Sequence, residues 1–111
     1  MKDELTIALA QMDVVPGKPG LNLDKMLHMI REAREKSVDL ICFPEMCLGG
    51  YLLGDKFLED SYCDELMSYN DDLLEASKDI AIAFGNIYVV RTSDGYHPNK
   101  DGRSRKYNAV Y

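Results

Sequence analysis

One carboxylate interrupts an otherwise uncharged run in the middle of this sequence. The run LICFPEMCLGGY covers residues 40–51, and Glu45 follows four apolar residues and a proline. A short apolar run that ends at a proline is typical of a buried strand followed by a turn. An ionised carboxylate is costly to remove from water unless another group pairs with it. Glu45 is therefore the first residue whose position indicates chemistry.

The position of Glu45 suits a general base. Residues just past the carboxyl end of a strand in an α/β sheet commonly bind ligands or take part in catalysis. Burial there would raise the pKa of the carboxyl group and make it a proton acceptor near neutral pH. The alternative is a structural glutamate whose carboxylate accepts backbone N–H groups of the following turn. The residues alone leave both interpretations open.

Two glycines and a tyrosine follow Glu45 closely. Gly49 and Gly50 permit a tight turn and a close approach to a ligand or to another segment. Tyr51 could project back toward Glu45, although a tyrosine in such a position is more often simply packed. We predict Tyr51 as a substrate-binding residue beside Glu45.

The three cysteines offer no evident thiol nucleophile. Cys42 lies within the apolar strand, where a small buried hydrophobe is the common explanation. Cys47 is close to Glu45, but no pair with a histidine is visible, because His28 falls in a predicted helix and His97 in a polar loop. An odd number of cysteines without CxxC spacing fits neither a disulfide framework nor a zinc site. Glycine motifs that bind phosphates or dinucleotides are absent from the sequence as well.

The segments that would position Glu45 alternate between strand and helix. Residues 5–10 predict a buried first strand, and residues 39–43 predict a second. Between them, Asn22 stands where a helix N-cap should, and residues 23–37 predict a helix. Its inner side is predicted to consist of Met26, Leu27, Ile30 and Ala33. A strand–helix–strand order favours parallel strands joined by a right-handed crossover.

The second half of the sequence continues this alternation. Residues 62–78 predict a helix, and residues 80–90 predict a long strand broken at Gly85-Asn86. Residues 93–104 predict a loop, and residues 107–111 begin a fourth strand. The inner side of the second helix is predicted to include Leu66, Met67, Leu73, Leu74 and Ser77. We expect a piece of a larger α/β unit, the alternative being a small self-contained domain that ends on an edge strand.

Composition bounds the class of protein. The chain of 111 residues allows one small domain, and its 46% hydrophobic and 29% charged residues are ordinary for a globular protein. A net charge of −6 argues against a nucleic-acid surface, which needs a basic patch. The N-terminal residues lack the basic region of a signal peptide, and no segment approaches the roughly 18 apolar residues of a membrane span. With reduced thiols, these features predict a cytoplasmic protein that binds neither nucleic acid nor membrane.

The run around Glu45 resembles the glutamate segment of the nitrilase, or carbon–nitrogen hydrolase, superfamily, in which an apolar strand is followed by F-P-E and then by G-Y. Other pieces agree in order: IALAQ at residues 7–11, Asn22 before the first helix, Phe84-Gly85 in the third strand and Tyr107-Asn108-Ala109 opening the next. The segment from Gly50 to Leu58 is similar to that of the glutaminase domains of glutamine-dependent NAD synthetases. The sequence departs from their pattern at Gly49, where Thr or Ser is usual, and at Leu52-Leu53, where two prolines are usual.

The resemblance implies a fold and a mechanism. The fold would be α/β, the N-terminal portion of an α-β-β-α sandwich of the nitrilase type. The chemistry would be hydrolysis of a non-peptide carbon–nitrogen bond by a Cys-Glu-Lys triad, with Glu45 as the base that takes the thiol proton. The triad lysine and cysteine would lie beyond Tyr111, since Lys106 precedes the Y-N-A strand and none of the three cysteines matches. The substrate would be a small amide, glutamine in the synthetases, and family members commonly form homo-oligomers.

The same resemblance implies which cofactors to expect and where the domain ends, and it leaves two alternative functions open. We expect no cofactor and no metal for the hydrolase chemistry, and ATP and Mg²⁺ only if a synthetase domain follows. Residues 1–111 would be the N-terminal part of a glutaminase domain, truncated within a strand and inactive alone. One alternative is another amidase, carbamoylase or nitrilase of the superfamily. A second is a catalytically dead fragment with an interaction role.

Overall fold

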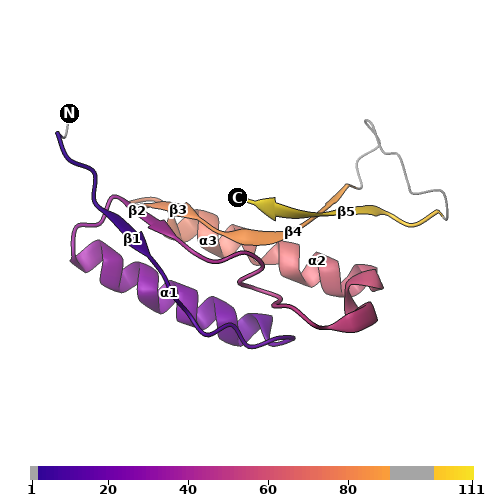
Figure 1. The fold of residues 1–111 in the computed structure, drawn as a ribbon. Coiled ribbons are helices and arrows are strands. Elements are labelled where there is room, and N and C mark those ends of the chain that lie inside the picture. The colour runs from indigo at the N-terminus through magenta and orange to yellow at the C-terminus, as the bar shows by residue number, and fades with distance from the viewer. Residues whose placement is uncertain (1–2, 91–101) are drawn as a thin grey trace.

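Helices lie on one side of the strands in this α/β structure (Figure 1), a computed structural model that describes residues 3–90 and 102–111. A three-stranded parallel sheet has the order β1 (Ile7–Leu9), β2 (Leu40–Cys42) and β3 (Ala81–Ala83). Ala8, Ile41 and Ile82 lie level with one another across it. The predicted parallel arrangement of the first two strands is therefore confirmed.

An antiparallel hairpin continues from the parallel sheet. It pairs β4 (Gly85–Val90) with β5 (Arg105–Val110). Phe84 separates β3 from β4 and exchanges two backbone hydrogen bonds with Tyr111, of 3.0 and 2.8 Å. The predicted break at Gly85-Asn86 was therefore misplaced, because both residues belong to β4. The loop predicted at residues 93–104 lies largely outside the described residues.

The first helix, α1 (Pro19–Glu35), begins four residues earlier than predicted. Proline suits the first turn of a helix, where its missing N–H has no intrahelical partner. The N-cap is Lys18, so the prediction of Asn22 as the cap was wrong; Asn22 lies inside the helix and is fully buried. Three of the predicted inner residues, Met26, Ile30 and Ala33, are buried, and Leu27 is half-buried.

The helix predicted at residues 62–78 is two helices, α2 (Asp60–Ser68) and α3 (Asn70–Ala76). A 3₁₀ segment, η1 (Gly54–Leu58), precedes them. Leu66 and Leu73 are buried as predicted, and Met67 and Ser77 are half-buried. Leu74 is 70% exposed, which contradicts the prediction. It follows Leu73 by about 100° around the helix, so the two cannot both face the core.

The core lies between the helices and one face of the parallel sheet. Ile41 and Ala10 are buried on that face. On the other face, Leu5, Ile7 and Leu9 are 66%, 49% and 76% exposed. The prediction of a wholly buried first strand was therefore wrong, because side chains alternate along a strand and the helices cover one face only. Among the described residues, no helix combines the length and apolar character that a membrane span requires.

Candidate active site

Glu45 lies in a tight turn at the carboxyl end of β2. This Glu45 turn, residues 44–50, includes a hydrogen bond from Gly50 N to Met46 O of 2.8 Å. Met46 is buried with a φ of 49°, in the left-handed region that favours glycine. Gly50 has a φ of 80°, and a Cβ there would lie 2.8 Å from Pro16 Cα. The surroundings must therefore impose the shape of this turn.

The side chain of Asn22 holds the Glu45 turn from the side of α1. Its Nδ2 donates to Leu48 O at 2.7 Å and to Val15 O at 2.9 Å. Its Oδ1 accepts a hydrogen bond of 2.9 Å from Val15 N. Buried polar groups are costly to leave unpaired, so these three bonds tie helix, preceding loop and turn together.

Gly85 at the start of β4 holds the same turn from the opposite side. A Cβ on Gly85 would lie 2.6 Å from Met46 N and 2.8 Å from Glu45 Cα. Both neighbours are backbone atoms, which cannot move aside as the end of a long side chain can. Only glycine therefore lets β4 pack directly against the backbone of Glu45.

Two side chains donate hydrogen bonds to the Glu45 carboxylate. One donor is the Tyr51 hydroxyl, and the other is the side-chain amide of Asn108 on β5, which donates to Oε1. The bond from Tyr51, and after it the bond from Asn108, lowers the pKa of Glu45 because both favour the ionised form. The same hydrogen bond to Glu45 raises the pKa of Tyr51 to about 12. Glu45 is thus an anion at neutral pH, oriented by two donors.

The environment of Glu45 corrects one expectation drawn from the sequence. Burial was expected to raise the pKa of its carboxyl group, but the residue is exposed and its pKa is lowered. The apolar residues that follow it, Met46, Cys47 and Leu48, are the buried ones. Both donors to the carboxylate, Tyr51 and Asn108, lie outside the turn. In the structural alternative, backbone N–H groups of the turn itself would donate to the carboxylate.

Two small hollows share Met46 and Tyr51 as lining residues. One, of about 250 Å³, is lined by Met12, Val14, Pro16, Pro44, Glu45, Met46, Gly50, Tyr51 and Leu52. The other, also about 250 Å³, is lined by Met46, Tyr51, Phe57, Ile87, Lys106, Tyr107 and Asn108. The predicted placement of Glu45 in a concave region beside Tyr51 is confirmed. The roles of Glu45 in catalysis and of Tyr51 in substrate binding stay predictions.

The cysteine that follows Glu45 most closely is an unreactive thiol. Cys47 is fully buried, with its Sγ 3.4 Å from Gly85 O and 3.6 Å from Met26 Sδ. Burial raises its pKa to about 11, so it is neutral at pH 7 and a poor nucleophile. Cys63 is also buried, and its thiol donates to Phe57 O at 3.2 Å.

The part of the chain that the structure describes contains one histidine, His28, and no candidate metal site. Within it, no group of three or more His, Cys, Asp or Glu side chains is placed to hold a metal ion. His28 is exposed on α1, with its Nε2 3.6 Å from Glu32 Oε1. His97 lies outside the described residues.

Lys106 anchors the strand that carries Asn108. Its side chain is only 15% exposed, and its Nζ lies 3.1 Å from Asp60 Oδ1. The same ammonium donates to Leu58 O at 3.3 Å. These contacts tie β5 to the junction between η1 and α2, and Lys106 itself lines the second hollow.

Sequence reasoning assigned no role to Asn108 or Gly85. Asn108 was noted only as part of a resemblance, and Gly85 as part of a resemblance and of a predicted break in the strand. A signal was present for Asn108, because asparagine is uncommon inside strands and β5 has the sequence RKYNAV. A signal for Gly85 was the glycine between two β-rich segments, which often marks a close backbone approach.

The fold and the position of Glu45 define a class of protein. The chain belongs to the carbon–nitrogen hydrolase family, whose model matches residues 6–111. The resemblance drawn from the run around Glu45 is therefore confirmed at the level of the family, and the mixed helix-and-strand fold is that of the nitrilase superfamily.

Two relatives are similar to this chain over most of its length. The chain is 34% identical over 101 residues to a glutamine-dependent NAD(+) synthetase of Acinetobacter baylyi, covering 86% of this chain and 18% of that protein. It is 27% identical over 93 residues to the synthetase of the same name from Thermotoga maritima, covering 84% and 16%. The chain thus spans less than a fifth of the length of these relatives.

Solved structures agree with membership of the carbon–nitrogen hydrolase family. A glutamine-dependent NAD(+) synthetase from Cytophaga hutchinsonii superposes with a TM-score of 0.76 at 26% identity, over 96% of this chain and 16% of that one. An amidase from Nesterenkonia sp. superposes with a TM-score of 0.68 at 24% identity, over 76% and 32%. At that identity the amidase shows the shared fold alone.

Proposed function

We propose that this chain is the N-terminal part of a glutaminase domain, with Glu45 as its general base. The reaction is hydrolysis of the side-chain amide of glutamine, and the released ammonia serves NAD synthesis. Support for the reaction class comes from membership of the carbon–nitrogen hydrolase family. Support for glutamine comes from similarity to glutamine-dependent NAD(+) synthetases.

The observation that carries the proposal is the Glu45 carboxylate itself. It stands at the carboxyl end of a parallel strand, beside two hollows, and accepts hydrogen bonds from Tyr51 and Asn108. A carboxylate that is ionised at neutral pH and held in one orientation is suited to accept a proton from a thiol. The exposure of Glu45 leaves room for that thiol and for a substrate to reach it.

The proposed reaction follows base-activated thiol attack. Glu45 takes the proton of the nucleophilic cysteine, and the thiolate attacks the amide carbon while a lysine stabilises the oxyanion. Ammonia leaves with the proton that Glu45 held, and water then hydrolyses the thioester. From the family resemblance we propose that this cysteine and lysine lie beyond Tyr111, and that residues 1–111 alone release no ammonia.

The test is an assay of ammonia release from glutamine by three samples. They are residues 1–111, the full-length protein, and full-length Glu45→Gln. Glutamine keeps the size and hydrogen-bonding capacity of the side chain but cannot accept the thiol proton at neutral pH. Because general bases contribute about 10²- to 10⁴-fold, Glu45→Gln should lower kcat by at least 100-fold. Glu75→Gln, an exposed glutamate on α3 paired with Lys78, is the matched control and should keep full activity.

Each result bears on a separate part of the proposal. Full activity of Glu45→Gln would contradict the role of Glu45. Ammonia release by residues 1–111 would contradict the placement of the other catalytic residues. A parallel assay with a simple aliphatic amide and an N-carbamoyl amino acid tests the substrate class. Faster turnover of either would favour another member of the superfamily.

A further inference from the structure

The β4–β5 hairpin contacts Glu45 at two separate levels. Gly85 on β4 packs against the backbone of Glu45, and Asn108 on β5 donates a hydrogen bond to its carboxylate. Asn108 lies directly opposite Ile87, two residues beyond Gly85, in the antiparallel register. A single rigid element therefore defines both where the Glu45 backbone lies and which way its carboxylate points.

The hairpin is itself well anchored near Asn108. On one side, Lys106 is held by Asp60 and by the carbonyl of Leu58. On the other side, the Tyr111 hydroxyl donates to Ile87 O at 3.1 Å. Asn108 thus lies between two anchored residues, Lys106 on β5 and Tyr111 directly after it.

We propose that Asn108 is a positioning residue for Glu45: its amide holds Oε1, so that the remaining lone pairs of the carboxylate face the hollow beside Tyr51. This inference rests on the proposed function, because orientation matters only if Glu45 accepts a proton. A carboxylate free to rotate would present the accepting oxygen in the productive direction for only part of the time. Misplacement of a catalytic group by about 1 Å can cost on the order of 100-fold in rate.

The chemistry of an amide suits this role better than that of a charged residue. The Asn108 N–H₂ group donates to the anion and keeps donating to the carbonyl oxygen after Glu45 has been protonated. Other titratable groups near the site are Tyr51 and Cys47 of the turn region, and Lys106, Tyr107 and Asp60 around the second hollow. The pKa of Tyr51 is about 12 and that of Cys47 about 11, so neither changes charge where Glu45 titrates.

The first experiment compares two Asn108 variants in the full-length protein. Asn108→Leu keeps the branching of the side chain and removes the donor, whereas Asn108→Asp keeps the shape and places a negative charge beside Glu45. Both should lower kcat by about 10- to 100-fold with little change in KM. The acid limb of the pH profile of kcat/KM should move to higher pH in Asn108→Leu and further still in Asn108→Asp.

A structural asparagine of the same hairpin supplies the matched control. Asn86 on β4 is fully buried and donates to Leu66 O and to Asn70 Oδ1, away from Glu45. Asn86→Leu should lower the melting temperature yet leave the acid limb where it is. A merely structural Asn108 would behave like Asn86, so unchanged acid limbs in both Asn108 variants would overturn the inference.

A measurement on the unmodified protein covers the case in which a variant fails to fold. The side-chain ¹⁵N–H₂ resonance of Asn108 should titrate together with the ¹³C carboxyl resonance of Glu45. An Asn108 resonance that stays constant while Glu45 titrates would overturn the inference without any assay. Full turnover by Glu45→Gln would contradict the proposed function and, with it, the positioning role of Asn108. Loss of turnover in Glu45→Gln with parent-like Asn108 variants would contradict the positioning role alone.

Discussion

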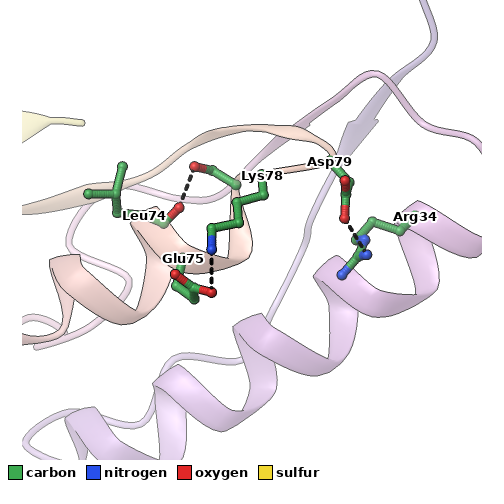
Figure 2. Close-up of polar contacts among 6 residues, drawn as sticks. Arg34, Leu74, Glu75, Lys78 and Asp79 are labelled. Carbon is green, nitrogen blue, oxygen red and sulfur yellow. Dashed lines mark hydrogen bonds and ion pairs between the residues drawn. The ribbon is translucent and has the colours of Figure 1, made fainter.

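The two edges of the parallel sheet are built in different ways. At the carboxyl edge, the Glu45 turn is held by the buried amide of Asn22 and by direct backbone contact with Gly85. At the amino edge, Arg34 of α1 forms an ion pair of 2.6 Å with Asp79, just before β3 (Figure 2). These two side chains are 44% and 67% exposed. One edge is organised by buried backbone contacts and the other by solvated charges.

The larger hollow is at the edge with the weaker interactions. It measures about 630 Å³ and is lined by Arg31, Arg34, Glu35, Ser37, Val38, Asp39 and Asp79. Three of its charged residues already have partners, because Arg34 pairs with Asp79 and Asp39 accepts the Thr6 N–H at 2.8 Å. The larger hollow therefore lies away from the proposed catalytic residue, Glu45. The proposal for Glu45 rests instead on its orientation by hydrogen bonds and on the uncommon backbone conformation of its turn.

The largest effect on stability is expected at Asn22. Asn22→Ala leaves backbone groups of Val15 and Leu48 without their buried partner. The free energy of unfolding should fall by about 2–4 kcal/mol, measured by urea denaturation. A loosened turn should also weaken the hydrogen bonds to Glu45, so the pKa of its carboxyl group should rise toward the usual value.

Asn86→Ala is the control for that prediction. Asn86 is equally buried and also forms three side-chain hydrogen bonds, to Leu66 O, Asn70 Oδ1 and Ile87 N. Its replacement should cost a similar free energy while leaving the pKa of Glu45 unchanged. If both variants moved that pKa equally, the special connection of Asn22 to the carboxyl edge would be disproved.

A somewhat smaller loss is expected at Gly85. Gly85→Ala places a Cβ against backbone atoms of Met46 and Glu45, which should cost about 1–3 kcal/mol of stability. Gly20→Ala on α1 is the control, because its Cβ would come no closer than 3.9 Å to the Tyr69 hydroxyl. That change should be neutral or stabilising, since alanine favours helices. Equal melting temperatures for both variants would argue against the close approach at Gly85.

The amino edge should tolerate the loss of its ion pair. Arg34→Gln and Asp79→Asn should each change stability by less than about 1 kcal/mol, because exposed pairs are screened by water and salt. A double-mutant cycle in urea gives the coupling between them. Coupling well above 1 kcal/mol would mean that the two edges are more alike than their exposure indicates.

The smallest contribution to stability at neutral pH is expected from the ionisation of the Cys47 thiol. Its pKa is about 9.0 when unfolded and about 11 in the fold, where burial disfavours the thiolate. Stability should be unaffected below pH 9 and should fall as pH rises from 9 toward 11, since only the unfolded thiol then releases its proton. Cys47→Ala should lack this component in urea titrations between pH 7 and 11. Identical pH dependence in both proteins would contradict the assignment to Cys47.

Local patterns in the sequence were sufficient for the parallel pair of β1 and β2 and for most of α1. Apolar spacing identified Met26, Ile30 and Ala33, because helical periodicity directly reports the covered side of a helix. The same reasoning placed Glu45 at the end of β2. Strand–helix–strand order then made a parallel pair the expected arrangement.

What could not be predicted depends on contacts between distant segments. Asn108 lies 63 residues from Glu45, and no local pattern indicates that β5 would bring its amide there. The exposure of Glu45 likewise depends on which parts of its turn pack inward. Asn22 was misassigned because an asparagine near a helix start resembles a cap unless its buried partners are known.

The structure bears on two of the three residues that depart from the synthetase pattern, Leu52 and Gly49. Leu52 has a φ of 62°, which the ring of a proline cannot adopt. A Cβ on Gly49 would lie 3.0 Å from Leu66 Cδ1, so a threonine or serine there requires Leu66 to move. The local backbone and its packing thus favour the residues that this sequence has.

The open face of the parallel sheet has a consequence for the handling of residues 1–111 in solution. Leu5, Ile7 and Leu9 are exposed on the face opposite the helices. Exposed apolar surface and unpaired strand edges promote association between chains. We therefore expect residues 1–111, expressed by themselves, to associate through this face as their concentration rises.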